Sequence, residues 1–114
     1  MRMWLGVQPK ELCDRHLVAE HGEIHKMAGH LAAGRSPEHW TSNGWIVLSQ
    51  MQTRHDLLAA EMVHRGFNHD GTKLLKTHTY TGPNGCNDPD RDRKELAERP
   101  YKCKGRIKSL CLQV

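Results

Sequence analysis

The stretch that decides the fold is residues 10–33, KELCDRHLVAEHGEIHKMAGHLAA. Apolar residues recur along it at spacings of about 3.6, which is typical of an amphipathic helix: Leu12, Leu17, Ile24, Ala28 and Leu31. Gly34 follows as a helix stop, and Ser36-Pro37 restarts the chain. We therefore predict a first long helix over residues 10–33.

A second long helix is predicted over residues 47–65, where apolar residues again recur at helical spacing: Leu48, Met51, Leu58 and Met62. Gly66 is expected to end this helix as the residue after its C-cap. A short third helix is predicted over residues 91–98, and Pro100 prevents it from continuing.

The remaining segments are predicted to lack long regular elements. Residues 1–9 are expected to form an extended arm that closes at Pro9. Residues 34–46 and 68–93 are expected to be loops, because both contain turn pairs of Asn, Gly and Pro. The predicted fold class is mostly α: a compact single-domain helical fold over residues 1–114, with the N-terminal arm packed beside the first long helix.

Composition restricts the class of protein. The 114 residues suffice for one domain, and 26% charged residues are usual for a soluble globular protein. A formal net charge of +4 suits a polyanionic partner. No apolar run approaches the ~18 residues of a membrane span, and the N-terminus does not resemble a signal peptide. We expect a cytoplasmic protein of phage or bacterial origin, with free thiols at its four cysteines: Cys13, Cys86, Cys103 and Cys111.

The first predicted helix carries a cluster of residues suited to catalysis. His16, Glu20 and Glu23 lie four and seven residues apart, so they share one face at the margin of the apolar stripe. Burial at such a margin can raise the pKa of a carboxyl group. The alternative interpretation is a solvated polar face with local salt bridges.

His21 and His25 are also four residues apart, as in helices that bind metal. The sequence HGEIH is not the HExxH motif, because in that motif the Glu directly follows the first His. No third ligand is evident, so neither a metal nor any other cofactor is expected. Contacts to DNA phosphates or bases are the preferred interpretation of both histidines.

Three windows of the sequence carry a resemblance: ELCDRHLVAEHGE at 11–23, RHDLLAAEMVHRGFN at 54–68 and LAERPYK at 96–102. The first two resemble the long helices of the pyrimidine-dimer DNA glycosylase/AP lyase family, typified by the endonuclease V of T-even phages. The third resembles the basic, aromatic C-terminal segment of that family.

The resemblance implies an enzyme that removes damaged or modified pyrimidines and then cleaves the strand at the abasic site. The family's nucleophile is an α-amine, which is partly unprotonated near neutral pH and forms an imine with the sugar. Its catalytic glutamate matches Glu23, which would stabilise positive charge on the sugar and move protons during β-elimination. The implied partner is double-stranded DNA carrying damaged or modified pyrimidines or abasic sites, bound by a monomer.

The chain departs from the family pattern at its start. The family begins Met-Thr-Arg and loses its methionine, whereas Arg2 here should block that trimming, so Met1 is expected to carry the reactive amine. The family's helix arginines are replaced by Gly22 and Lys26, and Lys26 keeps charge without bidentate geometry. A damaged or modified pyrimidine different from the family's usual lesion is therefore an alternative substrate.

These considerations give two sets of candidate residues. The catalytic set is Met1, Arg2, His16, Glu20 and Glu23. The nucleic-acid-binding set is His21, His25, Lys26, Arg54, Arg99, Tyr101, Lys102 and Lys104. We assign Arg65 a structural role and Trp4 a core position, and leave open whether Trp40 and Trp45 wedge into opened DNA or pack over the helices.

Two alternative functions belong to other classes. One is a non-catalytic DNA-binding module that kept the fold and lost the reaction. The other is a metal-dependent nuclease that uses four residues of the first helix: His16, Glu20, His21 and His25.

Overall fold

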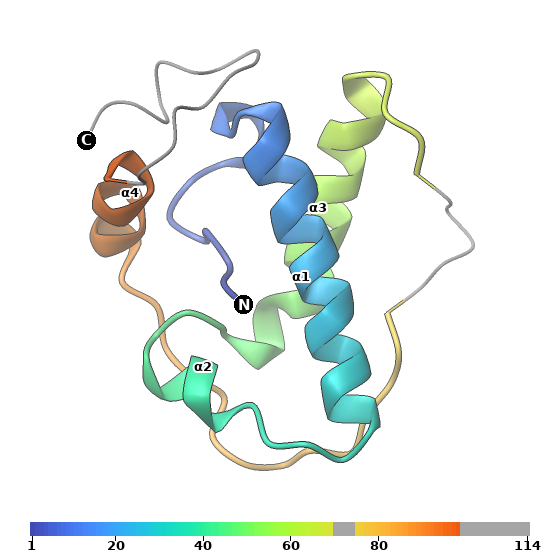
Figure 1. The fold of residues 1–114 in the computed structure, drawn as a ribbon, viewed down its shortest axis with the longest axis vertical. Coiled ribbons are helices and arrows are strands. Elements are labelled where there is room, and N and C mark those ends of the chain that lie inside the picture. The colour runs from blue at the N-terminus through green and yellow to red at the C-terminus, as the bar shows by residue number, and fades with distance from the viewer. Residues whose placement is uncertain (70–74, 99–114) are drawn as a thin grey trace.

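The computed structural model describes residues 1–69 and 75–98, and within these ranges all regular structure is helical (Figure 1). The α-helices are α1 (Asp14–Ala32), α2 (Glu38–Ser42), α3 (Met51–His64) and α4 (Pro89–Ala97). Two 3-10 turns, η1 (Pro9–Glu11) and η2 (Leu48–Gln50), precede α1 and α3. The predicted mostly α fold is confirmed. None of the described helices has the length and apolar character needed to cross a bilayer.

The long helices α1 and α3 lie side by side and enclose the core (Figure 1). Leu17 and Ile24 from α1 and Leu58 from α3 are at most 1% exposed. The apolar stripe that was recognised at helical spacing is therefore the buried one, since burial of apolar surface is the main force that brings the two helices together.

The first helix begins later than predicted, at Asp14 rather than residue 10. Pro9 opens a 3-10 turn instead, and Leu12 and Cys13 are extended, with ψ near 144° and 163°. The far end agrees with the prediction: Gly34 has φ +78°, and its N–H bonds to the carbonyl of Leu31 at 2.9 Å. Such left-handed residues commonly close helices.

Two further boundaries differ from the prediction. The expected loop 34–46 contains α2, whose first turn is closed by bonds from the N–H groups of Trp40 and Thr41 to the Pro37 carbonyl. The second long helix begins at Met51 rather than residue 47, because Val47 is extended and η2 intervenes. Gly66 ends α3 as predicted, with φ +86°.

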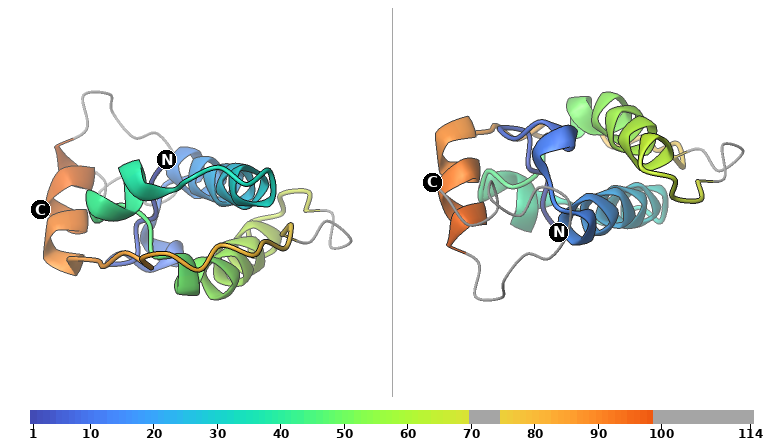
Figure 2. Two further views of the ribbon diagram at one scale, coloured as in Figure 1. Left: turned by 90° about the horizontal axis from the view of Figure 1, so that it is seen from below. Right: turned by 90° about the horizontal axis from the view of Figure 1, so that it is seen from above.

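The N-terminal arm lies between the α1–α3 pair and α4, and both views of Figure 2 separate the three layers. Met3 is fully buried, Trp4 and Val7 nearly so, and the Met3 N–H bonds to the carbonyl of Trp45 at 2.8 Å. Gly6 packs so tightly on the backbone of Pro89 that a Cβ atom would overlap it. The predicted packing of the arm beside the first helix is confirmed.

Helix α4 starts at Pro89, two residues before the predicted boundary. Asp88 caps it by accepting a hydrogen bond from the Arg91 N–H at 3.2 Å, and proline suits the first helical position because it has no N–H to leave unpaired. The preceding chain is held against η2 by Asn84, whose carbonyl accepts from the Leu48 N–H at 2.9 Å. These contacts bring α4 to the arm.

Candidate active site

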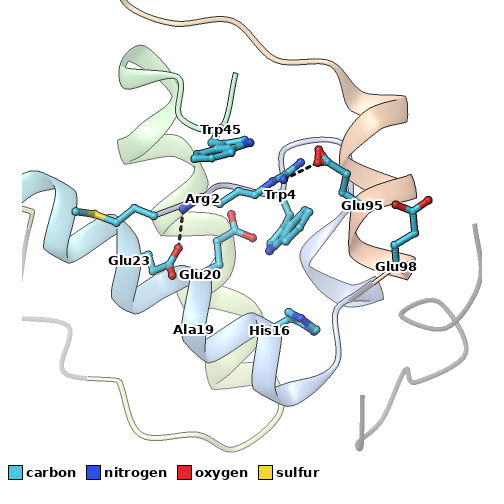
Figure 3. Close-up of a pocket in the computed structure, with 10 residues that line it drawn as sticks. Arg2, Trp4, His16, Ala19, Glu20, Glu23, Trp45, Glu95 and Glu98 are labelled. Atoms are coloured by element: carbon cyan, nitrogen blue, oxygen red, sulfur yellow. Dashed lines mark hydrogen bonds and ion pairs between the residues drawn. The ribbon is translucent and has the colours of Figure 1, made fainter. Parts of the chain in front are cut away.

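A cavity of about 540 Å³ lies where the arm crosses α1, with Trp45 and α4 completing its wall (Figure 3). All five predicted catalytic residues lie in the arm or on one face of α1, and all five line this cavity. The full lining is Met1, Arg2, Trp4, His16, Ala19, Glu20, Glu23, Trp45, Glu95 and Glu98.

The start of the chain meets the Glu23 carboxylate. The backbone N–H of Arg2 donates to Oε2 of Glu23 at 2.6 Å, although the two residues are 21 positions apart (Figure 3). Met1 also lines the cavity. The first two residues are therefore fixed beside the carboxylate that the helix presents.

The side chain of Arg2 extends away from Glu23 toward α4. Its Nη2 donates to Oδ1 of Asp92 and its Nη1 to Oε2 of Glu95, each at 3.1 Å. The guanidinium also lies 4.2 Å from the ring centroid of Trp4, within cation–π range. Hydrogen bonds from Arg2 and then Arg91 lower the pKa of Glu95 to about 2. Arg2 thus joins the arm to α4 while its backbone holds Glu23.

Glu20 forms a buried ion pair with Arg54 directly under the arm. Nε and Nη2 of Arg54 donate to the two carboxylate oxygens of Glu20 at 2.6 and 2.9 Å, a bidentate arrangement. Two further bonds, of 2.8 Å each, reach the carbonyls of Val7 and Trp4. Burial raises the pKa of Glu20, and the guanidinium of Arg54 opposes that rise.

This network corrects the predicted role of Arg54. Arg54 is only 4% exposed and bonds to Glu20 and to the carbonyls of Val7 and Trp4, so it is not available to a DNA phosphate. Glu20, at 2% exposure, is likewise engaged in holding Arg54. Both residues fix the arm against α1 and α3.

His16 is a buried residue of the cavity wall. Its Nδ1 lies 3.1 Å from Sγ of Cys13, and its ring meets the ring of Trp4 edge-on at 6.4 Å between centroids. Two other buried nitrogens of the lining, Nε of Arg2 and Nε1 of Trp45, have no hydrogen-bond partner within residues 1–69 and 75–98. Both N–H groups are buried in the wall of the cavity, where donors are seldom left unpaired.

The structure also tests the roles considered for the three tryptophans and Arg65. Trp4 is buried, as predicted. Trp40 packs on the core and between the rings of His30 and His39, so it is Trp45 that faces the cavity. Arg65 bonds to Glu61, Asp14 and the carbonyl of Leu12, and its structural role is confirmed.

The predicted DNA-binding set is dispersed. Lys26 is exposed on α1, three residues after Glu23. His21 and His25 turn instead toward α3, where they meet His55 and His69. Burial, and then the rings of His55, His25 and His69, lower the pKa of His21 to about 4. The remaining members, Arg99, Tyr101, Lys102 and Lys104, lie outside the described residues.

The residues of the metal-nuclease alternative do not come together. His16 and Glu20 line the cavity, whereas His21 and His25 belong to the histidine cluster on another side of the same helix. Sequence reasoning missed Asp92 and Glu95 as partners of Arg2, because no local pattern links residues about ninety positions apart.

A family model described as pyrimidine dimer DNA glycosylase matches residues 1–75 of the 114 in the chain. The match includes the arm, the cavity face of α1 and Trp45, and it ends before α4. No curated protein and no solved structure matches the chain.

Proposed function

Because the chain belongs to the pyrimidine dimer DNA glycosylase family, a family of DNA glycosylase/AP lyases, we propose that it excises damaged or modified pyrimidines and cleaves the resulting abasic site. The observation that carries the proposal is the 2.6 Å hydrogen bond between the Arg2 N–H and the Glu23 carboxylate. A chain start held against a cavity-lining carboxylate is the arrangement that imine chemistry by a terminal amine requires.

The proposed nucleophile is the α-amine of Met1. The nitrogen of Arg2 is an amide acylated by Met1 and is therefore not nucleophilic, whereas the amine one residue earlier belongs to a residue of the cavity wall. Its nitrogen forms a bond to C1′ as the bond from C1′ to the base breaks. The base leaves with the bonding electrons and takes up a proton, and ring opening leaves an imine at C1′.

Glu23 is proposed to stabilise the developing positive charge at C1′ and to move protons in the later steps. The imine acidifies C2′, whose proton is removed as the 3′-phosphate leaves by β-elimination. Water then hydrolyses the imine and restores the amine. The chemistry uses no cofactor, so chelation should leave it unchanged.

The other cavity residues would position these two groups. Arg2 fixes the arm by its bonds to Asp92 and Glu95, while Glu20 acts through Arg54. Trp45, which lines the cavity, would contact the extruded nucleotide, which reaches such a cavity only by leaving the duplex stack. Lys26 and the basic residues of the C-terminal segment would bind phosphates.

Borohydride trapping tests the proposal. Duplexes containing an abasic site, or irradiated with ultraviolet light, would be incubated with the protein and reduced, and the linked peptide mapped by mass spectrometry. We expect one adduct on the α-amine of Met1, insensitive to EDTA. A protein with an uncleaved N-terminal tag is the control and should give none.

The other outcomes are distinct. An adduct on a lysine side chain, or undiminished cleavage by the tagged protein, would contradict the terminal-amine mechanism. An adduct on Arg2 of a chain that has lost Met1 would contradict Met1 as nucleophile. Salt-sensitive DNA binding without any adduct would favour the non-catalytic DNA-binding module.

A further inference from the structure

Four histidines converge on the side of α1 that faces α3, away from the cavity. His21 and His25 come from α1 and His55 from α3, while His69 follows the end of α3. Ring centroids are 4.7 Å apart for His21–His25, 4.8 Å for both His21–His55 and His25–His55, and 4.9 Å for His21–His69. None of the four lines the proposed active site.

The ring nitrogens point at one another in two pairs. Nε2 of His55 lies 3.1 Å from Nε2 of His25, and Nε2 of His69 lies 3.1 Å from Nε2 of His21. Ligand nitrogens of His21, His55 and His69 all fall within 4.8 Å of one another. At a tetrahedral zinc ion with Zn–N bonds of about 2.0–2.1 Å, neighbouring nitrogens are about 3.3–3.4 Å apart. The two 3.1 Å pairs are close to that spacing, whereas the group of three has to close in from separations of up to 4.8 Å, and His25 joins it through its contact with His55.

One ring of the cluster already has the environment of a metal ligand. Nδ1 of His55 lies 2.9 Å from Oδ1 of Asp56, so the proton of the neutral ring belongs on Nδ1 and the lone pair on Nε2. A carboxylate that orients a histidine in this way is the usual second partner of zinc-bound imidazoles. His55 is 3% exposed, which fixes its ring further.

We propose that His21, His25, His55 and His69 bind one divalent transition-metal ion, with Zn²⁺ the best fit to four imidazoles. Two histidines one helical turn apart can reach the same ion, as they do in zinc-binding helices. Four protein ligands close the coordination sphere, which is typical of structural rather than catalytic zinc. The ion ties α1 to α3 and to the chain that follows α3, and it does not depend on the proposed glycosylase reaction.

Metal titration tests the site. Chelator-treated protein would be titrated with Zn²⁺ in competition with a chromophoric chelator, and with Co²⁺ monitored by visible absorption. We expect one equivalent of tightly bound Zn²⁺, a tetrahedral Co²⁺ spectrum without thiolate charge-transfer bands, and a melting temperature that rises on adding Zn²⁺.

Variants assign the ligands. His25→Gln and His69→Gln should each abolish the one-equivalent binding, while His64→Gln, at an exposed position in the last turn of α3, should leave it intact. The Asp56 side chain is 64% exposed, so Asp56→Asn should not disturb folding. This variant should weaken Zn²⁺ binding about 10–100-fold, because the carboxylate orients the His55 ring.

Three results would overturn the proposal. They are the absence of stoichiometric binding to the wild type, thiolate bands in the Co²⁺ spectrum, or the same affinity in Asp56→Asn and both ligand variants as in His64→Gln. The first result would mean that the four rings are only hydrogen-bonded to one another.

Discussion

Helix α1 presents two polar clusters on different sides, and they differ in how their charges are held. On the cavity side, the carboxylates of Glu20 and Glu23 are each bound by donors from distant segments, the Arg54 side chain and the Arg2 backbone. On the α3 side, the cluster consists of imidazoles, joined to one carboxylate at Asp56. A charged site suits proton transfer and a histidine cluster suits a metal, so one helix can carry both without overlap.

The largest effect should come from Glu23→Gln. This change removes the carboxylate proposed to move protons in the cavity and leaves the histidine cluster intact. The amide preserves the size of the side chain and can still accept the hydrogen bond from the Arg2 N–H. We expect strand cleavage at an abasic site to fall about 10²–10⁴-fold, the range for a general acid or base. Zn²⁺ binding should be unchanged, because the histidines lie elsewhere.

Single-turnover cleavage of an abasic duplex measures this effect. Glu38→Gln, at an exposed position on α2, is the matched control and should cleave like the wild type. Cleavage by Glu23→Gln at more than a tenth of the wild-type rate would show that another group moves the protons.

The second effect should be on stability. Arg54→Ala leaves the Glu20 carboxylate buried without its partner and frees the carbonyls of Trp4 and Val7. Removing one partner of a buried ion pair typically costs about 3–5 kcal/mol. Urea unfolding at neutral pH would measure the change, with Arg35→Ala, at an exposed position, as control. A loss below about 1 kcal/mol would mean that Arg54 does not hold the arm.

Chelation should affect the histidine cluster and leave the reaction on the cavity side unchanged. At free Zn²⁺ about 100 times its dissociation constant, a bound ion stabilises the folded state by about 2.7 kcal/mol. Removing it with EDTA should lower the melting temperature of the wild type but not of His25→Gln, and should leave borohydride trapping intact in both. Loss of trapping with the metal would mean that the two sides of α1 are coupled.

Features that depend on neighbouring residues could be predicted from the sequence, whereas contacts between distant segments could not. The face with His16, Glu20 and Glu23, and the glycine ends of both long helices, follow from spacing and backbone chemistry. The role of Arg54 could not follow, because its partner Glu20 lies 34 positions away and its carbonyl partners further still.

Only two of the four residues of the histidine cluster could be predicted from the sequence, for the same reason. His21 and His25 stood out at helical spacing, but His55 is 30 positions from His25, and His69 is 48 from His21. Only the packing of α1 on α3 brings them together, and no pattern within one segment encodes that packing. The start of α1 was missed for a local reason, since Pro9 favours a tight turn that apolar periodicity does not register.

The smallest effect concerns Glu95, which anchors Arg2 beside the cavity side of α1. Its pKa is lowered to about 2 by Arg2 and Arg91, below its unfolded value, so it stabilises the fold above the unfolded pKa of about 4.3. That contribution is lost as the pH falls through the folded pKa, between about pH 5 and 2. The side chain is 31% exposed, so solvent screening reduces the contribution to about 1 kcal/mol.

Glu95→Gln should therefore destabilise the protein at pH 7 and flatten the acid limb of its stability curve, as measured by urea unfolding at a series of pH values. Glu98→Gln offers the comparison, because Glu98 lines the same cavity, while the carboxylates that bind the Arg2 side chain within the described part of the chain are those of Asp92 and Glu95. If both variants kept the acid limb of the wild type, the link between Arg2 and α4 would rest on Asp92 alone. Because Arg2 also bonds to Glu23, a weakened link should slow cleavage more than it lowers stability, whereas the histidine cluster would be unaffected.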